Sequence, residues 1–175
     1  MTIRSKAELT TLFADNSNGD ISAQDLRDFL DSVNGSFGGM YVSSAAATTS
    51  MPLSSPVKAA GTTTATSLQN FTHADNRLTY TGPTDIHAHI ACSASFTSNK
   101  NDSIVGVYIA KNGIALPAPG LRTIANGADI GSTAVHGDSV LSTNDYIEVF
   151  VSINAVSSPS VTLDQCYLFA MGMLT

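Results

Sequence analysis

The chain has 175 residues, which suits one domain of ~100–150 residues with a few tens left over. Hydrophobic residues make up 43% of the chain, which excludes disorder, while charged residues make up 13%, well below the usual share of ~25%. The net charge of −6, with 8 scattered Lys and Arg residues, argues against a surface that binds phosphates, so we expect no nucleic-acid partner.

Membrane insertion and export are also not expected. No apolar run reaches the ~18–20 residues that span a bilayer, and residues 1–13 lack the apolar centre of a signal peptide. We therefore expect no membrane partner and synthesis in a cytoplasm.

Two capping boxes predict two short helices near the start of the chain. Ser5 stands three residues before Glu8, and Ser22 stands three residues before Asp25. At this spacing the serine accepts a hydrogen bond from the third backbone amide while the acid reaches back to the cap.

The apolar residues of these predicted helices form one stripe on each. Such short helices cannot bury their stripes well enough alone, so we expect the arm, residues 1–38, to anchor the chain to another protein. Asn34-Gly35 is expected to end the second helix with a left-handed turn. The predicted anchoring residues are Leu9, Leu12, Phe13, Leu26, Phe29, Leu30 and Val33.

The segment between the helices, residues 15–21, invites comparison with a calcium-binding loop. Gly19 and Ile21 fit the positions that require Gly and an apolar residue. The first ligand position falls on Ala14, however, and the last falls on Asp25 rather than Glu. We interpret the segment as a polar turn.

Residues 36–74 are rich in Ser, Ala, Thr and Gly, and no regular period runs through them. They form either a loosely ordered linker or edge strands and loops wrapped on the domain, with residues 39–43 as a candidate first strand. We place the start of the β domain at residue 39 and its end at residue 175.

The rest of the chain predicts strands. Residues 86–97 alternate between apolar and polar side chains over one long strand, and residues 146–154 alternate in the same way. Residues 104–110 lead into Asn112-Gly113, a dipeptide that favours a tight hairpin, and residues 166–174 form an apolar last strand. Many short strands without helices between them predict a mainly β, antiparallel sandwich.

Cys92 and Cys166 lie in apolar stretches and not at metal-ligand spacing. We expect buried free thiols rather than a disulfide. Whether the two strands bring them together stays open at this point.

No catalytic constellation is visible. His87 and His89 share one side of a strand, as in metal-binding cupins, but residues 91–95 contain no carboxylate, and His136 has no matching context. No Gly-x-Ser-x-Gly elbow occurs, and no Lys-Ser/Thr pair follows the glycine-rich segments 35–39 and 127–131. We expect no enzyme, no cofactor and no metal.

Four segments follow one another along the chain, at residues 76–82, 86–96, 107–113 and 140–150. In this order they are a strand, a long strand, a Lys-Asn-Gly hairpin and an Asp-Tyr turn into a strand. This order resembles the jelly-roll modules of the tumour-necrosis-factor (TNF) and complement-globular-head type, especially their viral relatives in phage fibres and capsid decorations. The resemblance covers residues 76–174 and implies a TNF-like jelly roll that forms a homotrimer.

The first residues carry a second resemblance. Asp-Asn-x-x-Gly-x-Ile-Ser at residues 15–22, leading into residues 25–33, looks like a segment near the start of phage tail and head-fibre proteins, where it attaches the chain. Since the sequence contains no shaft, we expect a virion structural protein, a capsid decoration or head-fibre knob bound to a capsid or tail protein. The alternative is a tail or baseplate fibre protein that binds a host receptor or a host-surface glycan.

The family resemblance also implies a subunit contact. In such modules the sheet that holds the long strand, the Asp-Tyr strand and the last strand meets the neighbouring subunits. The better core face is formed by Ile86, Ala88, Ile90, Ile147, Val149 and Val151. The opposite face then places five residues at the trimer interface, with Glu148 accepting a hydrogen bond from a histidine: His87, His89, Tyr146, Glu148 and Phe150.

Overall fold

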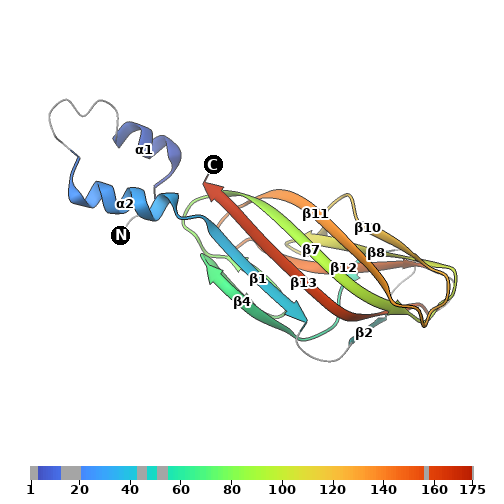
Figure 1. Cartoon of the computed structure of the whole chain (residues 1–175). Coiled ribbons are helices and arrows are strands. Elements are labelled where there is room, and N and C mark those ends of the chain that lie inside the picture. The colour runs from blue at the N-terminus through green and yellow to red at the C-terminus, as the bar shows by residue number, and fades with distance from the viewer. Residues whose placement is uncertain (1–3, 13–20, 43–46, 51–54, 156–157, 175) are drawn as a thin grey trace.

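The computed structural model describes residues 4–12, 21–42, 47–50, 55–155 and 158–174. Two helices, α1 (Lys6–Leu12) and α2 (Ala23–Val33), extend beyond one end of a sandwich of two β-sheets (Figure 1). The C-terminal end of the last strand lies at the same end as the helices (Figure 1). The helices therefore form an arm on a β domain.

One sheet, called the β13 sheet below, has the strand order β11-β7-β13-β1-β4, with β2 also paired to β13. Every strand pair in it is antiparallel. Its strands are β1 (Ser36–Val42), β2 (Ala47–Ser50), β4 (Thr63–Gln69), β7 (Ile86–Ser98), β11 (Gly131–Leu141) and β13 (Ser160–Leu174).

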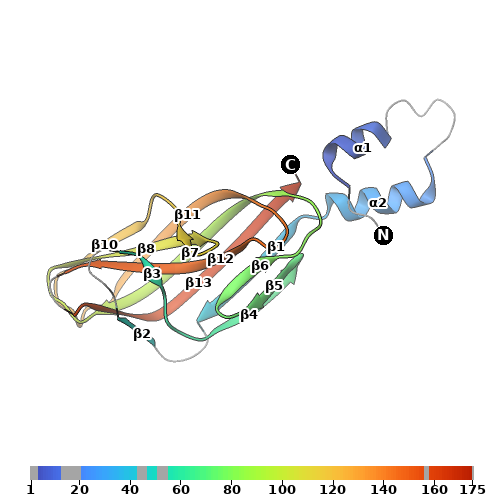
Figure 2. The same ribbon diagram turned by 180° about the vertical axis from the view of Figure 1, so that it is seen from behind.

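The other sheet, called the β12 sheet, has the order β10-β8-β12-β6-β5, with β3 paired to β12 (Figure 2). The short strand β9 pairs with β8. These pairs are antiparallel as well. Its strands are β3 (Val57–Lys58), β5 (Phe71–Ala74), β6 (Arg77–Tyr80), β8 (Ser103–Lys111), β9 (Ile114–Ala115), β10 (Gly120–Ile124) and β12 (Tyr146–Asn154). The predicted mainly β antiparallel sandwich is confirmed.

The long strand β7 shows how the sequence forms this architecture. Ile86, Ala88 and Ile90 are fully buried, while His87 and His89 between them are exposed. Side chains of a strand alternate between its two faces, so one face of β7 enters the core and the other meets solvent. The predicted alternation is confirmed. In the sheet, β7 lies between β11 and β13.

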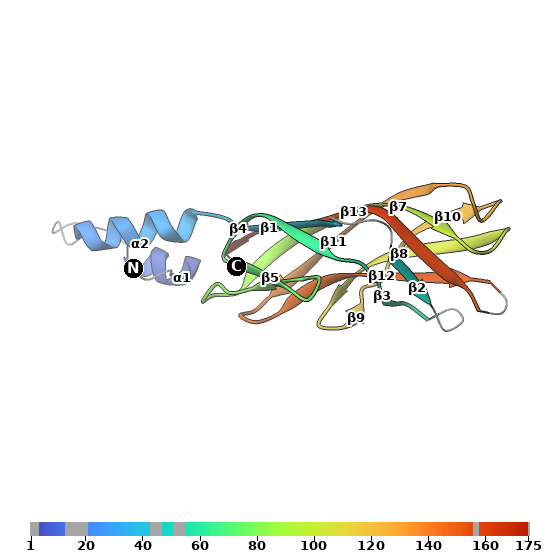
Figure 3. The ribbon, with the colours of Figure 1, turned by 90° about the horizontal axis from the view of Figure 1, so that it is seen from below.

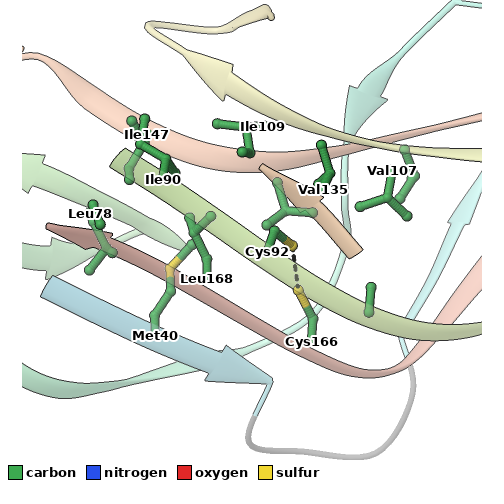
Figure 4. Packing of buried hydrophobic residues seen from close by; sticks show 14 of the residues in the cluster. Met40, Leu78, Ile90, Cys92, Val107, Ile109, Val135, Ile147, Cys166 and Leu168 are labelled. Atoms are coloured by element: carbon green, nitrogen blue, oxygen red, sulfur yellow. Dashed lines mark hydrogen bonds between the residues drawn. The ribbon is translucent and has the colours of Figure 1, made fainter. Parts of the chain in front are cut away.

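The core fills the space between the two sheets (Figure 4). Ile90 and Leu168 project from the β13 sheet, and Ile109 and Ile147 project from the β12 sheet; each is at most 2% exposed. Burying one such side chain contributes about 1.5–3 kcal/mol relative to leaving it in water. The facing apolar rows hold the sheets together.

The predicted hairpin at Asn112-Gly113 is confirmed. It joins β8 to β9, and both residues have positive φ angles, 52° and 79°. Glycine and asparagine tolerate this left-handed backbone, which matches the twist of the flanking strands.

The Ser/Thr-rich segment forms strands rather than a linker. β1, β4 and β5 run through it, and β2 and β3 add short pairings to β13 and β12. Of the two alternatives, strands are correct; β4 and β5 lie at sheet edges, while β1 lies between β13 and β4. Residues 43–46 and 51–54 lie outside the described residues. β1 begins at Ser36, slightly before the expected boundary.

The expected left-handed end of α2 is wrong. Asn34 is extended, with φ −68° and ψ 114°. After α2 the chain enters β1 almost directly. The strand requires extended backbone, and the chain does not reverse direction there, so no left-handed residue is needed.

Candidate functional site: an apolar sheet face and a helical arm

The outer face of the β13 sheet exposes a row of large apolar side chains. Tyr167, Met171 and Met173 of β13 are 40%, 53% and 74% exposed, and Tyr41 of the neighbouring β1 is 41% exposed. Tyr41 lies directly opposite Tyr167 in the strand register. Phe169, between these residues of β13, is half-buried. The row runs along the middle of the sheet, since β13 lies between β7 and β1 (Figure 1).

This sheet also has very little charge. Its six strands contain no Lys, Arg or Glu, and their only acidic residues are Asp138 and Asp164. The strands of the β12 sheet, by contrast, contain Lys58, Arg77, Lys111, Arg122 and Glu148. Monomeric proteins rarely leave a contiguous apolar patch of more than a few hundred Å² in water, so the β13 face is the candidate interaction surface.

An open groove of about 970 Å³ crosses this face between β1, β13, β7 and β11. Tyr41 and Tyr167 line it on one side, and Ser93 and Ser132 line it on the other. Its walls therefore combine aromatic rings with hydroxyl groups and carry little charge.

Histidines occupy the β7 and β11 side of the same face. The Nε2 atom of His87 lies 3.2 Å from the Oδ2 atom of Asp138, and the Nε2 atom of His89 lies 3.3 Å from the Nδ1 atom of His136. His87 and His89 thus lie on the outer face of the sheet, as predicted, and their role in a trimer stays a prediction. The nearness of His136 and Asp138 depends on the pairing of β11 with β7 and was not predicted.

The other three predicted interface residues lie elsewhere. Tyr146, Glu148 and Phe150 belong to β12, which is in the opposite sheet from β7 and β13. The expectation that these three strands share a sheet is wrong, because β12 pairs with β8 along its whole length after Tyr146. Alternation shows which side chains point inward but not to which sheet a strand belongs.

The surroundings of these residues agree with that placement. Glu148 is 3% exposed and forms an ion pair with Lys58, whose Nζ atom is 2.5 Å from its Oε2 atom. Within the chain, the charged partner of Glu148 is Lys58 and not a histidine. Tyr146 lies beneath the guanidinium of Arg77, 4.6 Å from the ring centre.

The arm buries its polar side and exposes its apolar side. Asp28 and Ser32 of α2 are 1% and 4% exposed. The Nε atom of Arg4 lies 3.1 Å from the Oδ2 atom of Asp28, and the backbone amide of Arg4 donates to the Ser32 hydroxyl over 2.8 Å. The chain that enters α1 thus covers the polar side of α2.

The predicted anchoring stripe is consequently open to solvent. Leu26, Leu30 and Val33 are 52%, 60% and 53% exposed, and Phe29 is 38% exposed. Leu9 is half-buried beside a cavity of about 210 Å³ that Val33 and Met173 also line. The side chain of Leu12 and the whole of Phe13 lie outside the described residues, so their part in the stripe stays a prediction.

Both predicted capping boxes are present. The backbone amide of Glu8 donates to the Ser5 hydroxyl while the Glu8 carboxylate accepts from the Ser5 amide, and Asp25 and Ser22 do the same. These hydrogen bonds to the serines lower the pKa of each carboxyl group. The helix starts are therefore fixed locally by the sequence.

Within the described residues, no group of three or more His, Cys, Asp or Glu side chains is arranged to hold a metal ion. The rejected calcium loop lies in residues 15–21, most of which are outside this part of the chain. No helix in the described ranges is long and apolar enough to cross a membrane.

Comparisons with known proteins match the fold but not the sequence. No protein-family model matches the chain, and no curated protein matches it. Among solved structures, the Eiger TNF from S. frugiperda has a TM-score of 0.53 at 7% identity, covering 79% of this chain and 92% of that one. Murine APRIL at pH 5.0 has a TM-score of 0.51 at 10% identity, covering 80% of this chain and 100% of that one.

The chain therefore has a TNF-like jelly-roll fold, as the sequence resemblance implied. At such low identities this likeness shows the fold alone.

Proposed function

We propose that this chain is a virion structural protein, a homotrimeric knob of the capsid-decoration or head-fibre type that its helical arm holds on a virus or bacteriophage particle. The observation that carries the proposal is the apolar outer face of the β13 sheet. The knob is non-enzymatic in this account, and its partners are two further copies and a capsid or tail protein.

The exposed apolar face of the β13 sheet favours self-association of the chain. In a monomer, the side chains of Tyr41, Tyr167 and Met171 would stay exposed to water. A protein–protein interface, which typically buries about 800 Å² of surface per partner, would cover them. Identical copies arranged about one axis cover such faces in a closed ring. The resemblance to trimeric TNF-like modules supports three copies.

The arm supports attachment. α1 and α2 project past the end of the sandwich and not over either sheet (Figure 3). Leu26, Leu30 and Val33 therefore extend from the knob, where another protein can cover them. The resemblance of residues 15–33 to the start of phage fibre proteins supports a particle as the site of attachment.

The experiment is incorporation into particles. The full chain and a variant that lacks residues 1–35 are supplied to particles assembled without the protein, and the purified particles are probed for the polypeptide. We expect the full chain at regular occupancy and the truncated chain absent from particles but folded. Equal incorporation of both would contradict the anchoring role, and absence of the full chain would contradict virion membership.

The alternative, a tail or baseplate fibre protein that binds a host receptor or glycan, is favoured by the groove beside Tyr41 and Tyr167. Sugars commonly stack on aromatic rings and bond to hydroxyl groups, and Ser93 and Ser132 supply hydroxyls there. Because the trimer would cover Tyr41 and Tyr167, this groove is open only in a chain that does not assemble through it. Glycan binding by the full chain, lost in Tyr167→Ala, would therefore favour this alternative.

A further inference from the structure

His89 and His136 are two exposed side chains on neighbouring strands whose rings lie close together. In the register of β7 with β11, His89 is opposite Asp138 and His136 is opposite Ala91. The two histidines are thus diagonal neighbours on one face of the sheet. Their ring centres are 5.4 Å apart and the rings are inclined by 32°.

The distance between their facing nitrogens fits a shared metal ion. The Nδ1 atom of His136 lies 3.3 Å from the Nε2 atom of His89. Hydrogen bonds from nitrogen donors are most often ~2.9–3.0 Å long, so this contact is a long one. Two imidazole nitrogens at ~2.0–2.1 Å from one tetrahedral ion are about 3.3–3.4 Å apart, which is the distance observed.

The surroundings favour a cation. Asp138 lies directly across from His89 and contacts His87, so a carboxylate and a third imidazole flank the pair. β7, β11 and β13 contain no Lys or Arg that would repel a cation. Both rings are exposed in the single chain, so water can fill the remaining coordination positions there.

We propose that His89 and His136 chelate one divalent transition-metal ion, such as Zn²⁺, Ni²⁺ or Cu²⁺, with water in the other positions. Imidazole is a preferred ligand of these ions, whereas Mg²⁺ and Ca²⁺ prefer oxygen ligands. The site goes beyond the proposed function and does not rest on it, because both ligands come from one chain. His89 is opposite Met171 on the face that we assign to the trimer, so the site lies within that face.

The test is calorimetric titration of the untagged full chain with Zn²⁺ and with Ni²⁺. We expect one ion per chain for each metal and no binding of Mg²⁺ or Ca²⁺. His89→Gln and His136→Gln should each weaken binding at least ~10-fold, since even residues that only orient metal ligands change affinity by 10–100-fold.

The matched control is His73→Gln. His73 lies on β5 of the other sheet, where its Nε2 atom is 2.7 Å from the Thr63 hydroxyl, so its loss should leave metal affinity unchanged. Circular dichroism shows whether each variant is folded. Absence of binding at millimolar metal, or equal affinity in the wild type and both ligand variants, would overturn the proposal.

Discussion

Cys92 and Cys166 hold their sulfur atoms 3.7 Å apart in the core, one on β7 and the other on the neighbouring β13, and remain free thiols (Figure 4). They are 2% and 8% exposed. The contact with Cys166, together with burial, raises the pKa of the Cys92 thiol well above its usual value. The prediction of buried free thiols is confirmed, and the two strands do bring the cysteines together.

Both thiols should resist modification in the native protein, because both are buried and little of either sulfur is open to a reagent. We expect no reaction with Ellman's reagent in native buffer over minutes and two equivalents in guanidinium chloride. Leu121→Cys, at a position 60% exposed, is the control and should react at once. Rapid reaction of the wild-type native protein would contradict this packing.

Asp145 fixes the turn between β11 and β12. Its carboxylate accepts from the Lys111 ammonium at 2.8 Å, the Asn112 amide at 2.7 Å and the Ser142 backbone amide at 2.9 Å. Burial raises the pKa of Asp145, but these hydrogen bonds outweigh it and hold the pKa below its usual value. Asp145→Asn should lower the free energy of unfolding by about 1.5–3 kcal/mol at pH 7.

The same carboxylate makes stability depend on pH. Since the native group binds its proton less tightly than the unfolded group, its contribution is complete above the unfolded pKa of ~3.9. It is lost as the pH falls through the lower native pKa. Urea unfolding at pH 7 and at pH 3, at one protein concentration, should show a smaller pH effect in Asp145→Asn than in the wild type. Equal pH dependence would contradict the assignment, and Asp129→Asn, at an exposed loop position before β11, is the control.

The stability of the sandwich should depend on the apolar side chains that face one another between the two sheets. Leu168 is fully buried, so Leu168→Ala should lower the free energy of unfolding by about 2–5 kcal/mol. Leu121→Ala, the exposed counterpart, should change it by less than about 0.5 kcal/mol. Denaturant midpoints measure both, and a similar loss in the two variants would show that Leu168 does not pack as described.

The sequence alone predicted individual helices and strands better than it predicted how the strands pair into sheets. The alternation in residues 86–97 and 146–154 defined β7 and β12, and Asn112-Gly113 defined the hairpin, because these signals are local. β10 and β11 were missed; in β11, the inward positions include Gly131, Thr133, Gly137 and Ser139, so no apolar alternation is visible.

The candidate site depends on which strands pair with each other, and the alternation of side chains along a strand does not reveal that pairing. Inward-facing residues alternate in the same way in both sheets, so Glu148 and Phe150 were placed beside His87 although β12 belongs to the opposite sheet. The contact of His89 with His136 likewise requires the register of two strands far apart in sequence. The stripe at Leu26 and Leu30 was visible because helical periodicity is local.

The trimer is the central claim, and it depends on the outer face of the β13 sheet. Met171→Asp places a charge in the middle of that face, where burial without a partner is costly. Leu121→Asp places the same charge at a similarly exposed apolar position of β10, in the β12 sheet. The two variants therefore differ in the sheet that they change and not in chemistry. Phe150→Ala, also in the β12 sheet, should leave the assembly intact.

Light scattering coupled to size-exclusion chromatography at micromolar concentration measures the mass directly. We expect three times the chain mass of 18.2 kDa for the wild type and for Leu121→Asp, and a folded monomer for Met171→Asp. A wild type that elutes as a stable monomer, or a Met171→Asp variant that keeps the trimer mass, would contradict the account.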